Sequence, residues 1–120
     1  MRKKILIIDD DGIYCSIIKK ILSHDYDLTF TENSQDAIEL INKSVLHDLI
    51  IADLRMPGVE GLEFIKLLIL SLKRKKTPLF VISGMDDEKL KTVIINMGVD
   101  KYFVKPIERF YLKEQIDSMF

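Results

Sequence analysis

The chain holds a single cysteine, Cys15, among its 120 residues. One cysteine excludes a disulfide within the chain and any metal site built from several cysteines, and it suits a reducing compartment. No apolar run approaches the roughly 18–20 residues that span a membrane. The basic residues 1–4 lead into an apolar run that stops at Ile8, which is too short for a signal peptide. We therefore expect a cytoplasmic protein with no membrane contact.

An excess of positive charge is also missing. The 18 Lys and Arg residues and 19 Asp and Glu residues give a formal net charge of −1. Without a basic surface, direct binding to nucleic acid is not favoured. Repeats, low-complexity segments and linkers are absent as well, so we expect one domain over residues 1–120. A chain of this length buries roughly two-thirds of the surface that its unfolded form exposes.

Four short apolar runs, rich in Ile, Val and Phe, predict strands that are buried on both faces. They lie at residues 5–8, 49–52, 79–82 and 102–104. Residues 28–31 alternate between apolar and polar side chains instead, which indicates a half-exposed edge strand.

Between and after these runs, apolar side chains recur at helical spacing in five segments. The predicted buried faces are Tyr14, Ile17, Ile18 and Ile21; Ala37, Leu40 and Ile41; Leu62, Ile65, Leu68, Ile69 and Leu72; Leu90, Val93, Ile94 and Met97; and Ile107, Leu112, Ile116 and Met119. We expect Asn33 or Ser34 to cap the second helix, Gly98 to end the fourth, and Pro106 to lie near the start of the last. Strand and helix thus alternate five times, which predicts a parallel sheet with helices on both faces, joined by right-handed crossovers.

Polar side chains stand at the ends of the predicted strands. They are Asp9, Asp10 and Asp11 after the first strand, Glu32 after the second, Asp53 after the third, Ser83 and Gly84 after the fourth, and Lys105 after the fifth. Each alone could be a helix cap, a turn residue or a surface lysine. Ligand sites of open α/β sheets lie outside the carboxyl ends of the strands. The shared position at one rim of the sheet therefore favours a functional site.

The types of these side chains indicate phosphoryl chemistry assisted by a divalent cation. Carboxylate oxygens suit Mg²⁺ (or Mn²⁺), an ion that keeps several waters and contacts phosphate. A carboxylate beside such a cation can act as a nucleophile and form an aspartyl-phosphate. A lysine and a hydroxyl can bind the oxygens of the transferred phosphoryl group. Three carboxylates would be balanced by one divalent cation and Lys105.

Four segments together make the sequence resemble the receiver domain of two-component response regulators. They are the acid pair Asp9-Asp10, the block 48–58 followed by Gly61, the pair Ser83-Gly84, and residues 98–106. They stand in the right order and each lies at a strand end, and the likeness runs from Ile5 to about Ile116. The resemblance implies a three-layer α/β/α fold of the flavodoxin-like type, with five parallel strands in the order 2-1-3-4-5. Since the sequence ends just after the last predicted helix, we expect a single receiver domain with no output domain in this chain.

Carried over position by position, the resemblance implies that Asp53 is the phospho-acceptor. Asp9, Asp10, Asp53 and the backbone carbonyl of Arg55 would bind the Mg²⁺ ion. Asp11 is expected to face the start of the first helix instead, where a negative charge is favourable.

The resemblance further implies a switch. Ser83 would move to bond the phosphoryl group, Lys105 would pair with that group, and the Lys105-Pro106 bond is expected to be cis. Tyr102 would be the switch aromatic, whose ring turns inward when Ser83 is drawn toward the phosphate.

The implied phosphoryl donor is a phosphohistidine on a sensor histidine kinase or a phosphotransfer protein. The chain would then be a signalling domain that catalyses only its own phosphorylation and dephosphorylation. Its switch would act on the face made by the fourth helix, fifth strand and fifth helix, for a downstream target or a second receiver. Ile95, Phe110 and Tyr111 lie off the predicted core stripes and, if exposed, would form an interaction patch there.

Other functions stay open. A receiver fold that no longer switches by phosphate would be a pure interaction module, although the acids, hydroxyl and lysine argue against it. An apolar strand followed by Asp9-x-Asp11-Gly12 also resembles the first motif of haloacid-dehalogenase-type phosphatases, with Asp9 as nucleophile and Asp11 as acid. That alternative has Ile13 where a threonine is usual, and it leaves the block around Asp53 unexplained. Nucleotide or flavin binding is disfavoured because no Gly-rich loop follows the first strand.

Overall fold

The computed structural model describes residues 2–43, 46–54, 59–72 and 76–120. Strands and helices alternate along these ranges, as the sequence predicts. Their bounds are β1 Lys4–Ile8, α1 Gly12–Leu22, β2 Asp27–Thr31, α2 Ser34–Asn42, β3 Leu49–Asp53, α3 Val59–Leu72, β4 Leu79–Ser83, α4 Glu88–Asn96, β5 Lys101–Val104 and α5 Arg109–Asp117. In the ranges described, none of the helices has both the length and the apolar character to cross a membrane.

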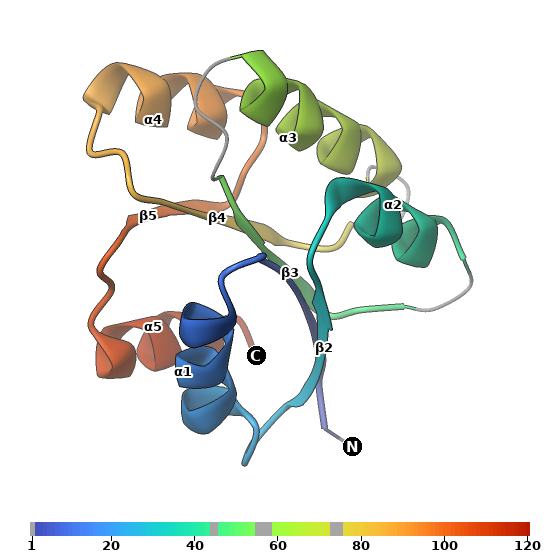
Figure 1. Cartoon of the computed structure of the whole chain (residues 1–120), viewed down its shortest axis with the longest axis vertical. Helices are drawn as coiled ribbons and strands as arrows, with labels where there is room; N and C mark the ends of the chain where they lie inside the picture. Colours follow the sequence, from blue (N-terminus) through green and yellow to red (C-terminus); the bar gives the residue numbers. More distant parts are fainter. Residues whose placement is uncertain (1, 44–45, 55–58, 73–75) are drawn as a thin grey trace.

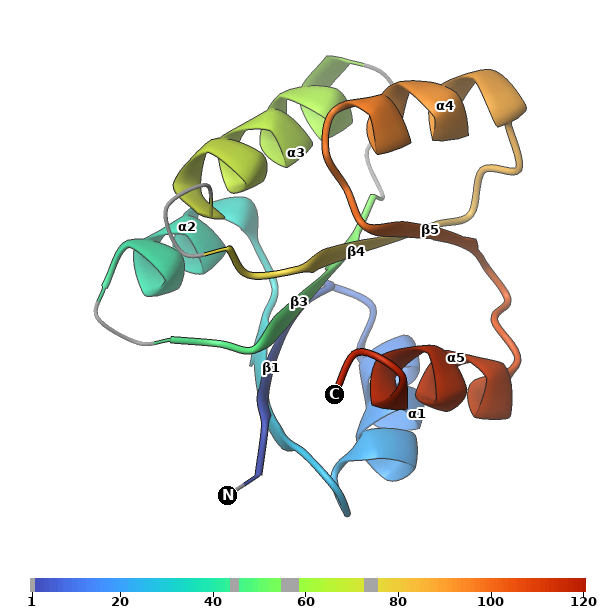
Figure 2. The same ribbon diagram turned by 180° about the vertical axis from the view of Figure 1, so that it is seen from behind.

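The five strands form one parallel sheet in the order β2-β1-β3-β4-β5. Helices α2, α3 and α4 cover one face of this sheet, and α1 and α5 cover the other (Figures 1 and 2). The predicted three-layer fold and strand order are therefore confirmed. The predicted edge strand is confirmed too, because β2 lies at one edge and its side chains alternate between exposed and less exposed positions.

Two apolar cores hold these layers together, one on each face of the sheet. Alternate strand residues point to opposite faces, so Leu6 and Val81 join the core under α2, α3 and α4, while Ile5 and Phe80 join the core under α1 and α5. All four side chains are fully buried. Complete burial of a large apolar side chain contributes roughly 1.5–3 kcal/mol, so these strand residues contribute substantially to the stability of the fold.

Two acidic residues of the segments that carry the family resemblance stabilise the amino-terminal edge of the sheet. The Asp48 carboxylate accepts a hydrogen bond from the backbone N–H of Lys4 at 2.7 Å, and the Asp100 carboxylate accepts one from the N–H of Leu79, also at 2.7 Å. Charge-assisted bonds of this kind are stronger than neutral ones. They tie the loops before β3 and β5 to the first residues of β1 and β4, and so help to set the strand register.

The predicted helix boundaries agree with the structure at two of three positions. The Asn33 side chain caps α2 by accepting a hydrogen bond from the N–H of Asp36, and α4 ends just before Gly98, whose φ is +113°. The last helix begins later than predicted. It starts at Arg109, where the carboxylate of Glu108 caps the helix by accepting hydrogen bonds from the N–H groups of Phe110 and Tyr111.

Two predicted core residues prove to be exposed. Ile17 on α1 and Val93 on α4 expose 46% and 47% of their surface, whereas their neighbours Ile18 and Ile94 are buried. Both helices are short and bury a narrow stripe, and a step of one residue turns a side chain by about 100° around the helix axis. Apolar pairs in adjacent positions do not show by themselves which member faces the sheet.

Candidate functional site

The strand register brings two predicted site residues side by side at the carboxyl edge of the sheet. Ile8 of β1 pairs with Ala52 of β3, so Asp9 comes next to Asp53, the last residue of β3. Carboxylate oxygens of Asp9, Asp10 and Asp53 lie within 4.8 Å of one another. They line a hollow of about 110 Å³ together with Glu32, which follows the edge strand.

Lys105 reaches this acidic cluster from the other side. Ser83 pairs with Val104 at the ends of β4 and β5, and the N–H of Lys105 donates to the carbonyl of Ser83 at 2.7 Å. The side chain then extends across the rim, with its Nζ 3.1 Å from Asp53 Oδ2 and 3.6 Å from Asp9 Oδ2. The ammonium therefore bridges two carboxylates whose side chains are almost completely buried.

Burial has the largest effect on the ionisation of Asp9. It raises the pKa of this carboxyl from 3.8 to about 6, and the nearby charge of Asp53 acts in the same direction. The N–H of Asp11, which donates to Asp9 Oδ1 at 2.8 Å, and the Lys105 ammonium both lower this pKa. On balance, the buried position favours the protonated form of Asp9. Clustered carboxylate oxygens beside an open hollow fit a hard divalent cation such as Mg²⁺.

The third aspartate of the run has a structural task. The Asp11 side chain accepts hydrogen bonds from the N–H groups of Ile13 and Tyr14 and so caps α1, as predicted. Asp10, in contrast, is exposed at the rim. An Asp11 carboxylate held at the helix start is badly placed to serve as the acid of a phosphatase, which weighs against that alternative.

Ser83 and Tyr102 both form hydrogen bonds with the backbone of one residue, Met85. The fully buried Ser83 hydroxyl accepts a hydrogen bond from the N–H of Met85 at 3.0 Å. The Tyr102 hydroxyl donates to the carbonyl of the same residue at 2.8 Å. Tyr102 exposes only 9% of its surface. Met85 therefore connects the two hydroxyl groups through its N–H and its carbonyl.

The structure adds one residue that the sequence placed only on the core face of the first helix. The ring of Tyr14 lies against the Lys105 ammonium, with 4.2 Å between Nζ and the ring centroid. Burial, together with the charges of Asp9 and Asp53, raises the pKa of Tyr14 to about 12, so its hydroxyl is neutral. Tyr14 follows the cap Asp11 by three residues, so it lies in the first helical turn, which borders the rim. This position was the signal in the sequence that could have placed Tyr14 near the site.

Part of the predicted site lies outside the described residues. This applies to Arg55, whose carbonyl is a predicted metal ligand, and to residues 56–58 of the same block. The roles assigned to the other site residues stay predictions. Ile95, Phe110 and Tyr111, whose exposure the sequence left open, expose 37%, 67% and 49% of their surface, and the predicted cis bond between Lys105 and Pro106 is present.

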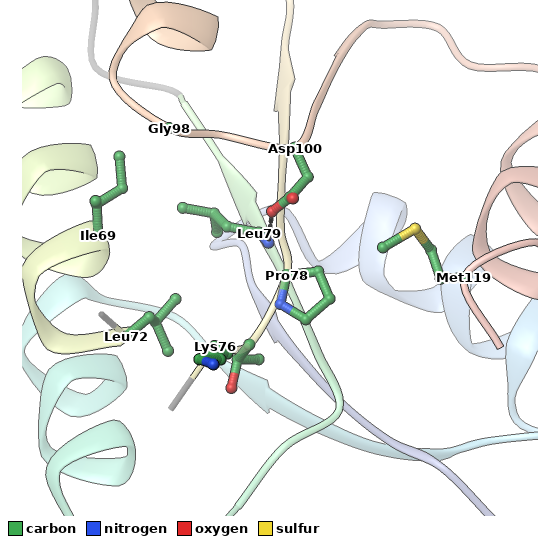
Figure 3. Close-up of a pocket in the computed structure, with 9 residues that line it drawn as sticks. Ile69, Leu72, Lys76, Pro78, Leu79, Gly98, Asp100 and Met119 are labelled. Atoms are coloured by element: carbon green, nitrogen blue, oxygen red, sulfur yellow. Dashed lines mark hydrogen bonds between the residues drawn. The ribbon is translucent and has the colours of Figure 1, made fainter. Parts of the chain in front are cut away.

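A larger cavity of about 290 Å³ lies elsewhere, beside the amino-terminal end of β4 (Figure 3). Its lining includes the apolar side chains of Ile69, Leu72 and Met119. The Asp100 carboxylate at this cavity is engaged with the N–H of Leu79, as the dashed line in Figure 3 shows. The residues predicted to take part in phosphoryl chemistry lie at the other edge of the sheet, at the smaller acidic hollow.

Comparisons with known proteins agree with this architecture. The cell cycle response regulator CtrA of Brucella ovis is 30% identical over 117 residues, which cover 97% of this chain and 49% of CtrA. The chain therefore spans about half the length of the curated relatives it matches.

Two solved structures show the same fold. The receiver domain of the Francisella response regulator 1452 is 28% identical with a TM-score of 0.84, and the match covers 98% of this chain and 96% of that one. The chemotaxis response regulator CheY4 of Vibrio cholerae is 21% identical with a TM-score of 0.84, over the whole of both chains. A family model described as the response regulator receiver domain matches residues 5–117. The chain thus belongs to the response regulator receiver domain family, the family that its strand-end residues resemble.

Proposed function

We propose that this receiver domain takes a phosphoryl group onto Asp53 from a phosphohistidine of a sensor histidine kinase or a phosphotransfer protein. The observation that carries the proposal is the placement of Asp53 at the centre of the rim. Its Oδ2 lies 3.1 Å from the Lys105 ammonium, and its carboxylate shares the acidic cluster with Asp9 and Asp10. A nucleophilic carboxylate, a cation for the phosphoryl oxygens and a candidate metal cluster thus occupy one small volume.

The proposed reaction is a single in-line transfer. A carboxylate oxygen of Asp53 forms a bond to phosphorus while the bond between phosphorus and the imidazole nitrogen of the donor breaks. The electron pair of that bond leaves with the imidazole. The Lys105 ammonium stabilises the negative charge on the phosphoryl oxygens during the transfer, and it is already held at the site by Asp53 and Asp9.

Asp9, Asp10 and Asp53 would hold a Mg²⁺ ion, together with the backbone carbonyl of Arg55. When bound, such an ion offsets the negative charge of the carboxylates and of the phosphoryl oxygens. The raised pKa of Asp9 supports this assignment, because a buried carboxylate with a charged neighbour gains most from a cation.

The signal would leave the site through Ser83. Phosphorylation adds up to about two negative charges and several hydrogen-bond acceptors beside this hydroxyl. If Ser83 turns to the new group, it gives up its bond with the N–H of Met85, whose carbonyl holds the Tyr102 hydroxyl. The surface affected is that of α4, β5 and α5, where exposed Ile95 and Tyr111 offer apolar area to a downstream target or a second receiver. Phe110 instead lines a hollow beside Ile21 of α1.

The proposal is tested by labelling the purified chain with acetyl phosphate in the presence of Mg²⁺ and measuring its intact mass. We expect one phosphoryl adduct, which is lost when EDTA replaces Mg²⁺. Asp53→Asn should form no adduct. Asp11→Asn is the matched control, because Asp11 caps α1, and it should still be labelled. An adduct that survives Asp53→Asn, or no adduct on the unaltered chain, would overturn the assignment.

A further inference from the structure

A series of contacts connects the first turn of α1 with Lys105 and leads back to Asp9. The Asp9 carboxylate accepts the N–H of Asp11, and the Asp11 carboxylate in turn accepts the N–H of Tyr14 at 3.2 Å. The Tyr14 ring lies 4.2 Å from Lys105 Nζ, and Lys105 returns to Asp9 and Asp53. Asp9, a predicted metal ligand, therefore helps to fix, through the capping residue Asp11, the backbone that carries the ring.

We propose that Tyr14 is a positioning residue, whose ring holds the Lys105 ammonium over Asp53 so that it is ready for the incoming phosphoryl group. The inference rests on the proposed phosphorylation of Asp53. It adds to that function a part played by Tyr14, a residue in the first turn of α1 whose ring lies against Lys105.

Contact with the ring restricts the conformational freedom of the long Lys105 side chain. A lysine has a flexible four-carbon stem, and an ammonium that must be gathered from solvent loses rotamer freedom at the moment of transfer. The face of an aromatic ring attracts an ammonium, and more strongly where water is excluded. Lys105 meets this condition, because its side chain is only 20% exposed. When the phosphoryl group replaces the free carboxylate of Asp53, the ring keeps the ammonium at the rim while its anionic partner changes.

The attraction belongs to the ring face and not to the hydroxyl, so two substitutions separate the possibilities. Tyr14→Leu removes the ring but keeps an apolar side chain at this half-buried position. Tyr14→Phe keeps the ring and removes only the hydroxyl. With acetyl phosphate and Mg²⁺, we expect the initial labelling rate to fall about three- to tenfold in Tyr14→Leu and to stay within about twofold in Tyr14→Phe.

A second measurement needs neither metal nor phosphodonor. The ε-methylene protons of Lys105 adjoin the ring, so ring currents should move their NMR resonances upfield in the metal-free, unphosphorylated protein. We expect this shift in the unaltered chain and in Tyr14→Phe, and its loss in Tyr14→Leu. The same spectra show whether each variant is folded.

A double substitution tests whether the ring acts through the lysine. In a Lys105→Met background, Tyr14→Leu should cause no further loss of labelling rate. The inference is overturned if the ε-proton resonances of Lys105 do not respond to Tyr14→Leu, if both Tyr14 variants lose the same rate, or if the loss persists in Lys105→Met. Failure of the proposed function is a separate result, an adduct that survives Asp53→Asn, and it leaves the ε-proton measurement unaffected.

Discussion

Replacing Asp9 by asparagine should make the metal-free protein more stable at pH 7 while removing its response to Mg²⁺. Asp9 exposes 5% of its surface and its carboxylate shares the rim with that of Asp53. Without a metal, its negative charge is held at a buried site beside a second negative charge. Asparagine has nearly the same shape, and its side-chain carbonyl can still accept the N–H of Asp11.

The magnitude follows from the pKa of Asp9, which burial above all raises from 3.8 to about 6. Between these values the folded protein binds more protons at Asp9 than the unfolded chain does, so stability falls as the pH rises through this range. At about 1.4 kcal/mol for each tenfold change in proton affinity, the charged carboxylate costs the metal-free fold about 3 kcal/mol at pH 7. The amide NH2 of asparagine must find hydrogen-bond acceptors of its own at this buried position, so we expect a net gain of about 1–2 kcal/mol.

The assay is urea unfolding in EDTA at several pH values. Asp9 becomes protonated at higher pH in the folded protein than in the unfolded chain. As the pH is lowered from 7 toward 4, the unaltered chain should therefore gain stability relative to Asp9→Asn. In saturating Mg²⁺ the order should reverse, since a ligand at 100 times its Kd stabilises the form that binds it by about 2.7 kcal/mol.

Asp10→Asn is the matched control for this experiment. Asp10 belongs to the same acidic cluster but is exposed, so its substitution should impair the response to Mg²⁺ with less effect on the metal-free stability. The reasoning is refuted if metal-free Asp9→Asn is no more stable than the unaltered chain at pH 7. It is also refuted if the difference between the two proteins does not change with pH.

Three further outcomes are expected. Burial, more than any other cause, raises the pKa of the Cys15 thiol to about 11, so its alkylation by iodoacetamide at pH 8 should be much slower than that of a free thiol. An equal rate would contradict this prediction. The Lys113 ammonium lowers the pKa of Asp117, so Asp117→Asn should remove a stabilising contribution that is present above about pH 4 and is lost below it. If the variant is destabilised, relative to the unaltered chain, by the same amount at pH 7 and at pH 3, this prediction is wrong. Gly98→Ala should lower the free energy of unfolding in urea by about 1–2 kcal/mol, because φ at Gly98 is +113°. Gly84→Ala should be nearly neutral, since no atom lies within 4 Å of the added methyl group. Equal losses in the two variants would contradict the role given to the backbone conformation of Gly98.

Much of the fold was predictable because its signals are local. Continuous apolar runs indicate strands covered on both faces, and their alternation with helical segments admits few topologies. The residues after each run could be placed at one edge of the sheet for the same reason. Details that depend on rotation about a helix axis were not predictable. Ile17 and Ile18 are alike in sequence, and only packing against the sheet shows that Ile18 is the buried one.

By itself the sequence determined the strands, their common polarity, and the acids, hydroxyl and lysine at their ends. The tertiary structure decided which of these groups touch. The pairing of Ile8 with Ala52 puts Asp9 beside Asp53, and the crossing of Lys105 over the rim brings its ammonium to both carboxylates and to the ring of Tyr14. Contacts of this kind join residues far apart in the chain. They depend on register, side-chain direction and burial, and these exist only once the sheet and its helices have come together.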